Sequence, residues 1–114
     1  MNLENLRQFC LALPGTTEDV KWEDHLCFNI GGKMYAITML DGTTTVSLKV
    51  TDEAFEELIA RPHIIPAPYL ARYKWVQLED MQALTDQEWK NYVKQSYELV
   101  KSKLPKKLQK ELAL

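Results

Sequence analysis

His25 and Cys27 are the residues of this sequence best suited in type and spacing to covalent chemistry. They lie two positions apart, so on a β-strand both side chains would point to the same face and could act as a base and a thiolate. No third residue is placed to orient the histidine, and cysteine is commonly a small buried hydrophobic residue. We therefore predict no catalytic residues and expect that the protein is not an enzyme.

Cys10, Cys27, His25 and His63 are of the types that bind zinc, but they lack the paired short spacings of zinc sites. Cys10 and Cys27 are expected on different sides of the sheet, which also argues against a disulfide between them. An acidic run at residues 18–24 could attract cations, but we interpret it as a solvated loop, because carboxylates on a flexible segment do not form a preorganised cage. The sequence therefore predicts no metal and no cofactor.

Aromatic and basic side chains are concentrated at Tyr69, Arg72, Tyr73, Lys74 and Trp75. Single-stranded nucleic acids bind to such a mixture by stacking on the rings and by attraction of the backbone to the cations. Tyrosine and tryptophan also fill the cores of small domains, and this second interpretation is favoured. Trp75 is the candidate stacking residue if the first interpretation holds.

Lysines are concentrated at the end of the chain, at positions 101, 103, 106, 107 and 110, where only Glu111 interrupts the series. They could bind phosphates or an acidic protein surface. They could equally form a solubilising face that complements the dipole of a terminal helix, and this is favoured because no arginine offers bidentate phosphate recognition. The candidate nucleic-acid contacts are Lys33, Lys49, Arg72, Lys74, Trp75, Lys103, Lys106 and Lys107.

The net charge of the 114 residues is only -2, but it is unevenly distributed. Residues 1–60 carry 4 basic and 10 acidic side chains, whereas residues 61–114 carry 10 basic and 6 acidic ones. A negative net charge disfavours binding to nucleic acid, but the basic second half of the chain leaves such binding as an alternative. The start of the chain lacks the pattern of a secretion signal, and no apolar run is long enough to span a membrane, so we expect a cytoplasmic protein.

The chain is predicted to form a single domain over residues 1–114. Apolar spacing predicts a first helix capped by Asn2, and glycine-containing turns predict an antiparallel meander of strands at residues 25–30, 33–39 and 44–50. With Ile30 opposite Lys33 and Met39 opposite Thr44, the two faces of this meander separate by polarity. The predicted core face holds Leu26, Phe28, Ile30, Tyr35, Ile37, Met39, Val46, Leu48 and Val50. The predicted open face holds His25, Cys27, Asn29, Met34, Ala36, Thr38, Thr45, Ser47 and Lys49.

The remaining elements are a helix that begins after Thr51, a strand at residues 74–78, and a long helix over residues 85–104. Thr85 and Glu88 have the spacing of a capping box at the start of the long helix. Pro105 separates it from a short amphipathic end. Helices that cover one face of an antiparallel sheet make a two-layer α+β domain.

The order and spacing of several short motifs resemble the MmcQ/YjbR family over essentially the whole chain. The motifs are Leu13-Pro14-Gly15, Glu18-Asp19, Gly31-Gly32-Lys33-Met34-Tyr35, Ser47-Leu48-Lys49, Trp75, Ser96-Tyr97 and Lys103-Leu104-Pro105-Lys106-Lys107. The resemblance implies a CyaY-like fold of order α-β(3)-α-β(2)-α, with a fifth strand near residues 67–70. It also implies DNA binding through a double-wing arrangement of hairpins.

Two functions from different classes follow. The first is DNA binding, as the resemblance implies, with the C-terminal lysines contributing more than the hairpin tips, since the second hairpin carries Asp41. The alternative is a module that binds a protein or a small ligand on the open sheet face, without nucleic-acid binding. The sequence does not indicate an oligomeric state.

Overall fold

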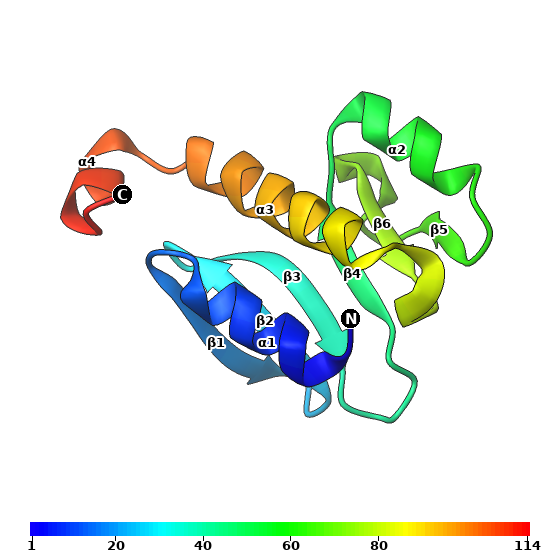
Figure 1. Cartoon of the computed structure of the whole chain (residues 1–114). Helices are drawn as coiled ribbons and strands as arrows, with labels where there is room; N and C mark the ends of the chain where they lie inside the picture. The colour runs from blue at the N-terminus through cyan, green and yellow to red at the C-terminus, as the bar shows by residue number, and fades with distance from the viewer.

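The computed structural model describes the whole chain, residues 1–114. Six strands form one antiparallel sheet in the order β1-β2-β3-β4-β6-β5, and α1, α2 and α3 pack against one of its faces (Figure 1). The strands are β1 (Thr16–Lys21), β2 (His25–Ile30), β3 (Lys33–Met39), β4 (Val46–Lys49), β5 (Ile64–Pro66) and β6 (Trp75–Leu78). The helices are α1 (Leu3–Ala12), α2 (Asp52–Ile59), α3 (Asp86–Ser102) and α4 (Lys106–Glu111), with 3-10 turns η1 (Ala71–Tyr73) and η2 (Met81–Ala83). The predicted α+β class is confirmed.

The helix starts are those that the sequence predicted. The side chains of Asn2, Thr51 and Thr85 each accept a backbone N–H of the first turn of α1, α2 and α3. At α3 the capping box is complete, because Glu88 also accepts the backbone N–H of Thr85. No helix of the structure has the length and apolar character that a membrane span requires.

Strand β1 replaces the solvated acidic loop that was predicted there. It pairs with β2 along its whole length at the edge of the sheet. Its acidic side chains are satisfied by neighbours on the two faces: Glu18 pairs with Arg7 of α1 at 2.7 Å, and Asp19 accepts a hydrogen bond from Asn29 at 2.8 Å. An edge strand whose partners are polar shows no apolar alternation, which is why the sequence pattern did not reveal it.

A β-bulge on β3 changes the predicted faces of the meander. The pairing of Ile30 with Lys33 is confirmed, but the register then shifts by one residue at Tyr35, so that Phe28 pairs with Ala36. Tyr35 and Ala36 are both buried in the main core. Beyond the bulge, every side chain of β3 is therefore on the opposite face from the one predicted.

The strand after the bulge shows this reversal directly. Ile37 and Met39 were predicted in the core but line the open face, whereas Thr38 was predicted on the open face and is buried. The pairing of β3 with β4 is also displaced by one residue. The predicted register placed Thr38 opposite Thr45, whereas Thr38 pairs with Val46.

The bulge is held by a buried hydroxyl from the long helix. Ser96 of α3 donates to the carbonyl oxygen of Tyr35 at 2.5 Å, and its Oγ accepts the backbone N–H of Lys49 at 3.0 Å. The rings of Tyr35 and Tyr97 meet edge to face at 5.4 Å. Serine in the middle of α3 thus joins two strands of the sheet to the helix layer.

The proline-rich segment contains the predicted extra strand, but at a different place. The strand is β5, which pairs with β6 as an edge strand, and not residues 67–70. Residues 67–70 instead fold over the open face, where Ala67 and Leu70 pack with Trp75. This loop covers one part of the open face and leaves the rest accessible.

Candidate ligand pocket on the open sheet face

A pocket of about 690 Å³ lies on the sheet face that the helices leave uncovered. Strands β3, β4 and β6 supply its floor, and three loops surround it: the β1–β2 turn, the β3–β4 loop and the loop over residues 67–70. Its lining residues are Trp22, His25, Met34, Ile37, Met39, Asp41, Thr43, Thr45, Ser47, Pro68, Tyr69, Leu70 and Gln77. The volume lies within the range of small-molecule sites in proteins.

The floor is a row of directly opposed residues across three central strands. Ile37 pairs with Ser47, and Ser47 pairs with Gln77, so their side chains lie side by side on the open face. The hydroxyl of Ser47 and the amide of Gln77 form no hydrogen bond with another protein group, while Ile37 provides an apolar surface beside them. This combination of apolar area with a few free polar groups is typical of pockets that bind organic ligands.

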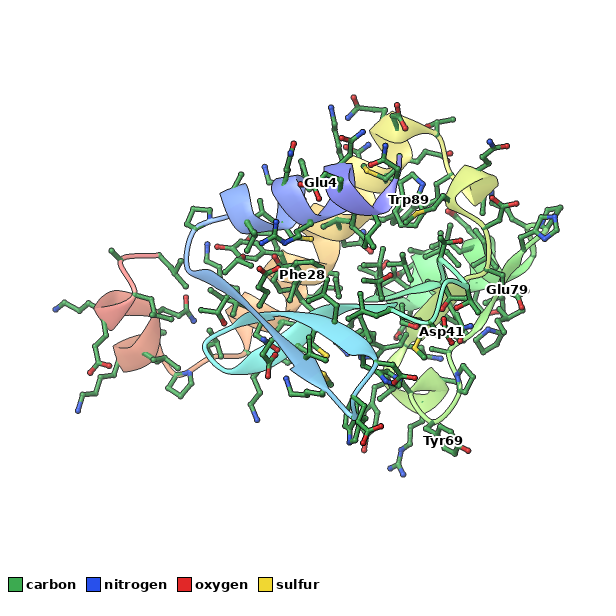
Figure 2. All side chains as sticks on the ribbon, turned by 90° about the horizontal axis from the view of Figure 1, so that it is seen from below. Glu4, Phe28, Asp41, Tyr69, Glu79 and Trp89 are labelled. Atoms are coloured by element: carbon green, nitrogen blue, oxygen red, sulfur yellow. The ribbon has the colours of Figure 1, made fainter.

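The walls carry exposed aromatic side chains. Trp22 in the β1–β2 turn is 65% exposed and meets the ring of His25 edge to face at 5.2 Å. Tyr69 in the opposite loop is 99% exposed. In Figure 2, Asp41 and Tyr69 both lie at the end of the molecule away from α4.

Several residues around the pocket have left-handed backbone conformations that non-glycine residues rarely adopt. The φ angles are 52° at Trp22, 71° at Glu23, 52° at Thr44 and 67° at Tyr69. Each costs of order 1 kcal/mol relative to an ordinary conformation, and such strain is concentrated at binding sites in proteins. Strain from three separate loops around one pocket indicates that their geometry is set by more than local preference.

The electrostatics of the pocket are negative. Asp41 is its only acidic lining residue, and no lysine or arginine lines it. Hydrogen bonds from the Thr43 hydroxyl and backbone N–H lower the pKa of Asp41 below its usual range, so the carboxylate is ionised at neutral pH. His25 is 2.6 Å from the carboxylate of Asp24, which adds a second acidic group beside the pocket.

The side chains of Cys27 and His25 are not hydrogen-bonded to each other, and the ring of His25 is instead 2.6 Å from the carboxylate of Asp24. Cys27 is buried, and its Sγ lies near the carbonyl oxygen of His25 rather than the ring. Burial raises the pKa of both thiols, to about 12 for Cys10. The two cysteines lie in separate apolar clusters and are not bonded to each other.

The predicted nucleic-acid contacts do not form one surface. Trp75 is only 6% exposed beneath the 67–70 loop, which fits the favoured interpretation of a core residue and not the alternative of a stacking platform. Lys74 lies over the ring of Phe55 on α2, and Arg72 lies over the ring of Tyr73. These cations are engaged with neighbouring rings of their own chain.

Lys49 is similarly engaged. Its ammonium donates to the carbonyl oxygen of Tyr73 at 2.7 Å, and desolvation, with a smaller contribution from Lys103, lowers its pKa.

The remaining four candidates gather at the opposite end of the molecule from the pocket. Lys103, Lys106 and Lys107 are exposed around the α3–α4 junction, and Lys33 follows the β2–β3 turn. That turn packs on the junction, because a Cβ at Gly31 would lie 2.7 Å from Leu104. We call Lys33, Lys103, Lys106 and Lys107 the terminal lysine group.

The pocket itself was only partly predicted. His25, Met34, Thr45 and Ser47 were correctly placed on the open face, whereas Ile37 and Met39 were placed in the core and Gln77 was not assigned. The alternation of β6, with Trp75 and Gln77 on one face, was the available signal for Gln77. Nothing local in the sequence indicates the bulge that turns Ile37 and Met39 outward.

Residues 11–99 match the model of the YjbR family. The chain belongs to the YjbR family. A crystal structure of a Deinococcus radiodurans protein with the domain DUF419 is 32% identical, with a TM-score of 0.89, and the match covers 99% of this chain and 88% of that one. No curated protein matches the chain.

A crystal structure of a Pseudomonas syringae protein shares the fold at 23% identity, with a TM-score of 0.74, over 88% of this chain and 99% of that one. Several motifs of the resemblance to the YjbR family are explained by packing. Tyr97 donates to the carbonyl oxygen of Pro14, which joins two of the motifs, and Ser96 holds the bulge of a third. These motifs therefore specify the fold and do not by themselves indicate a ligand.

Proposed function

We propose that this protein is a small-molecule binding module whose ligand occupies the open-face pocket. The observation that carries the proposal is the row formed by Ile37, Ser47 and Gln77, which places apolar area and free polar groups on the floor of a cavity of about 690 Å³. A sheet face with no such role would be expected to carry scattered polar side chains rather than a walled hollow.

Because no lysine or arginine lines the pocket, we do not expect it to bind anionic ligands. Phosphates and carboxylates are bound in proteins by basic side chains or by clustered backbone N–H groups. Here the lining holds no lysine or arginine, and it holds the carboxylate of Asp41, which would repel an anion. The proposal is therefore restricted to neutral or cationic ligands.

The test is ligand-observed saturation-transfer NMR with fragment mixtures grouped as neutral, cationic and anionic. We expect signals from the neutral and cationic mixtures with the wild-type protein, and we expect Ser47→Leu, which fills the floor, to abolish them. Thr17→Leu is the matched control, since Thr17 is exposed on the same sheet face but outside the pocket. Binding only of anions, or binding that Ser47→Leu leaves intact, would contradict the proposal.

A second candidate function is nucleic-acid binding by the terminal lysine group. The observation that favours it is the packing of the β2–β3 turn on the α3–α4 junction, which brings Lys33 to the end of the molecule that holds the other three exposed lysines (Figure 1). Grouped lysines attract phosphates through counterion release. Fluorescence anisotropy with duplex and single-stranded oligonucleotides at low and physiological salt tests this function, and no binding at low salt would exclude it.

A further inference from the structure

The charge of the pocket and its aromatic walls narrow the class of ligand, on the assumption that the proposed function is correct. We infer that the open-face pocket binds an organic cation of the alkylammonium class. In this arrangement Trp22 and Tyr69 contact the cationic head, and the carboxylate of Asp41 is its counter-ion.

Asp41 has one carboxylate oxygen available for such a ligand. Its Oδ1 accepts both the backbone N–H of Thr43 at 3.0 Å and the hydroxyl of Thr43 at 2.6 Å. Its Oδ2 forms no hydrogen bond with the protein. The hydrogen bonds from Thr43 fix the position of the ionised group, while the second oxygen remains free for a cation.

The two aromatic rings come from different halves of the sheet. Trp22 belongs to the turn between β1 and β2, and Tyr69 belongs to the loop between β5 and β6. Both rings line the pocket although both are largely exposed to solvent, which is unfavourable for side chains with large apolar area. The faces of such rings attract quaternary and other ammonium groups within about 6 Å of the ring centre.

The backbone at both rings strengthens this assignment. Trp22 and Tyr69 each have a left-handed conformation, with φ angles of 52° and 67°, where glycine or asparagine would be less strained. Two strained aromatic residues at one pocket indicate that the rings themselves are needed at these positions.

The surrounding charges favour a cation over a neutral ligand of the same shape. Glu23 and Asp24 follow Trp22 in the turn, and His25, the one basic lining residue, is 2.6 Å from the carboxylate of Asp24. Lys21 lies on the open face of β1, opposite His25, and its ammonium is paired with the carboxylate of Asp19 at 2.9 Å. The terminal lysine group lies at the other end of the molecule, as the position of α4 relative to Asp41 and Tyr69 shows (Figure 2).

The test uses three probes of nearly equal shape and different charge: choline, 3,3-dimethylbutan-1-ol and 3,3-dimethylbutanoate. Each is titrated into the ¹⁵N-labelled full chain, and affinities are taken from the amide shifts of Ile37, Ser47 and Gln77. We expect choline to bind about tenfold more tightly than the alcohol, and we expect no binding of the carboxylate.

Variants with matched controls test whether Asp41 and Tyr69 cause the preference for choline. Asp41→Asn and Tyr69→Leu should each weaken choline binding about fivefold and leave the affinity of the alcohol within twofold of wild type. The controls are Glu57→Gln, an exposed carboxylate on α2, and Tyr73→Leu, a half-exposed ring of η1 that does not line the pocket. The amide spectrum of each variant verifies that it is folded.

The outcomes separate this inference from the function on which it rests. Equal affinities for choline and the alcohol, both insensitive to Asp41→Asn, would overturn the cation inference while the pocket remained a ligand site. Amide shifts of the floor with none of the probes, and no fragment signal that depends on Ser47, would overturn the inference and the proposed function together.

Discussion

Ser96 shows how one small side chain stabilises an irregular sheet. The bulge at Tyr35 leaves a backbone carbonyl oxygen without a partner on the neighbouring strand, and the backbone N–H of Lys49 lies where β4 ends. The fully buried hydroxyl of Ser96 satisfies both groups. A mid-helix serine that looks replaceable in the sequence is therefore a structural residue.

Ser96→Ala should lower the free energy of unfolding by about 1–3 kcal/mol, because it leaves two buried backbone groups without partners. Thermal unfolding followed by circular dichroism measures the change, which corresponds to a decrease in Tm of roughly 4 °C per kcal/mol. Ser102→Ala is the control, since Ser102 is exposed near the end of the same helix. Equal Tm values for the two variants would contradict this role.

Tyr69 provides a test of backbone strain at the pocket. Tyr69→Asn should raise the free energy of unfolding by about 0.5–1 kcal/mol, because asparagine adopts the left-handed conformation more readily and the exposed ring contributes little to packing. The same substitution should weaken ligand binding. Urea unfolding measures the stability, with Tyr73→Asn as the control, and a loss of stability in Tyr69→Asn would show that the ring serves the fold.

At the scale of elements, regular features were predictable from the sequence and features set by distant partners were not. The helix N-caps, the glycine turns and the proline stops are local, so α1, α2, α3, β2 and β3 were found close to their observed bounds. Strand β1 depends on Arg7 and Asn29 to satisfy its acidic residues, and the bulge depends on Ser96, 61 positions away. Such partners are visible only after folding.

The consequence for the candidate site is direct. The open face was predicted, but Ile37 and Met39 were assigned to the core because the bulge reverses the pattern of β3. Trp75 is buried, as the favoured interpretation expected, but the loop over residues 67–70 that covers it was not predicted. Loops and bulges, which lack periodic patterns, determine both the pocket and its walls.

The contact between α2 and α3 predicts a dependence of stability on acid. Arg61, just after α2, forms two hydrogen bonds with Glu88 of α3 and lowers the pKa of that carboxyl from 4.5 to about 2. A carboxyl whose pKa is lowered by folding stabilises the folded state at pH values above its ordinary pKa. This contribution is lost as the pH falls from about 4.5 through about 2.

Glu88→Gln should therefore reduce the difference in Tm between pH 6 and pH 2.5, because the variant has no carboxyl to protonate at this contact. Thermal scans of the wild type, Glu88→Gln and Glu57→Gln at the two pH values measure the effect. The Glu57 variant, which removes an exposed carboxyl of α2, should behave as the wild type does. A wild-type difference that survives in Glu88→Gln would contradict the assignment.

For the molecule as a whole, the uneven charge of the sequence becomes a spatial separation. The acidic first half supplies Asp41 and the β1–β2 turn at the pocket, and the basic second half supplies most of the terminal lysine group at the opposite end (Figure 2). The molecule therefore carries two surfaces of opposite charge although its net charge is small. A ligand in the pocket and a polyanion at the lysines would not compete for the same residues.

If the terminal lysine group binds DNA, replacing Lys106 and Lys107 by glutamine should lower the slope of log K against log salt by about 1.8, since each phosphate contact contributes roughly 0.9. Anisotropy titrations over a range of salt concentrations measure the slope. Lys90→Gln with Lys94→Gln, on the exposed side of α3, is the matched control. An identical loss of slope in both double variants would show that the attraction is not localised at α4.

The proposal that the open sheet face is a ligand site is tested most directly by an amide shift map with a saturating non-anionic ligand from the fragment screen. We expect shifts only at the pocket residues of β3, β4 and β6 and in the three surrounding loops, with none at Lys103, Lys106 or Lys107. Shifts centred on those lysines or on the helix layer, with the floor residues Ile37, Ser47 and Gln77 unchanged, would contradict it.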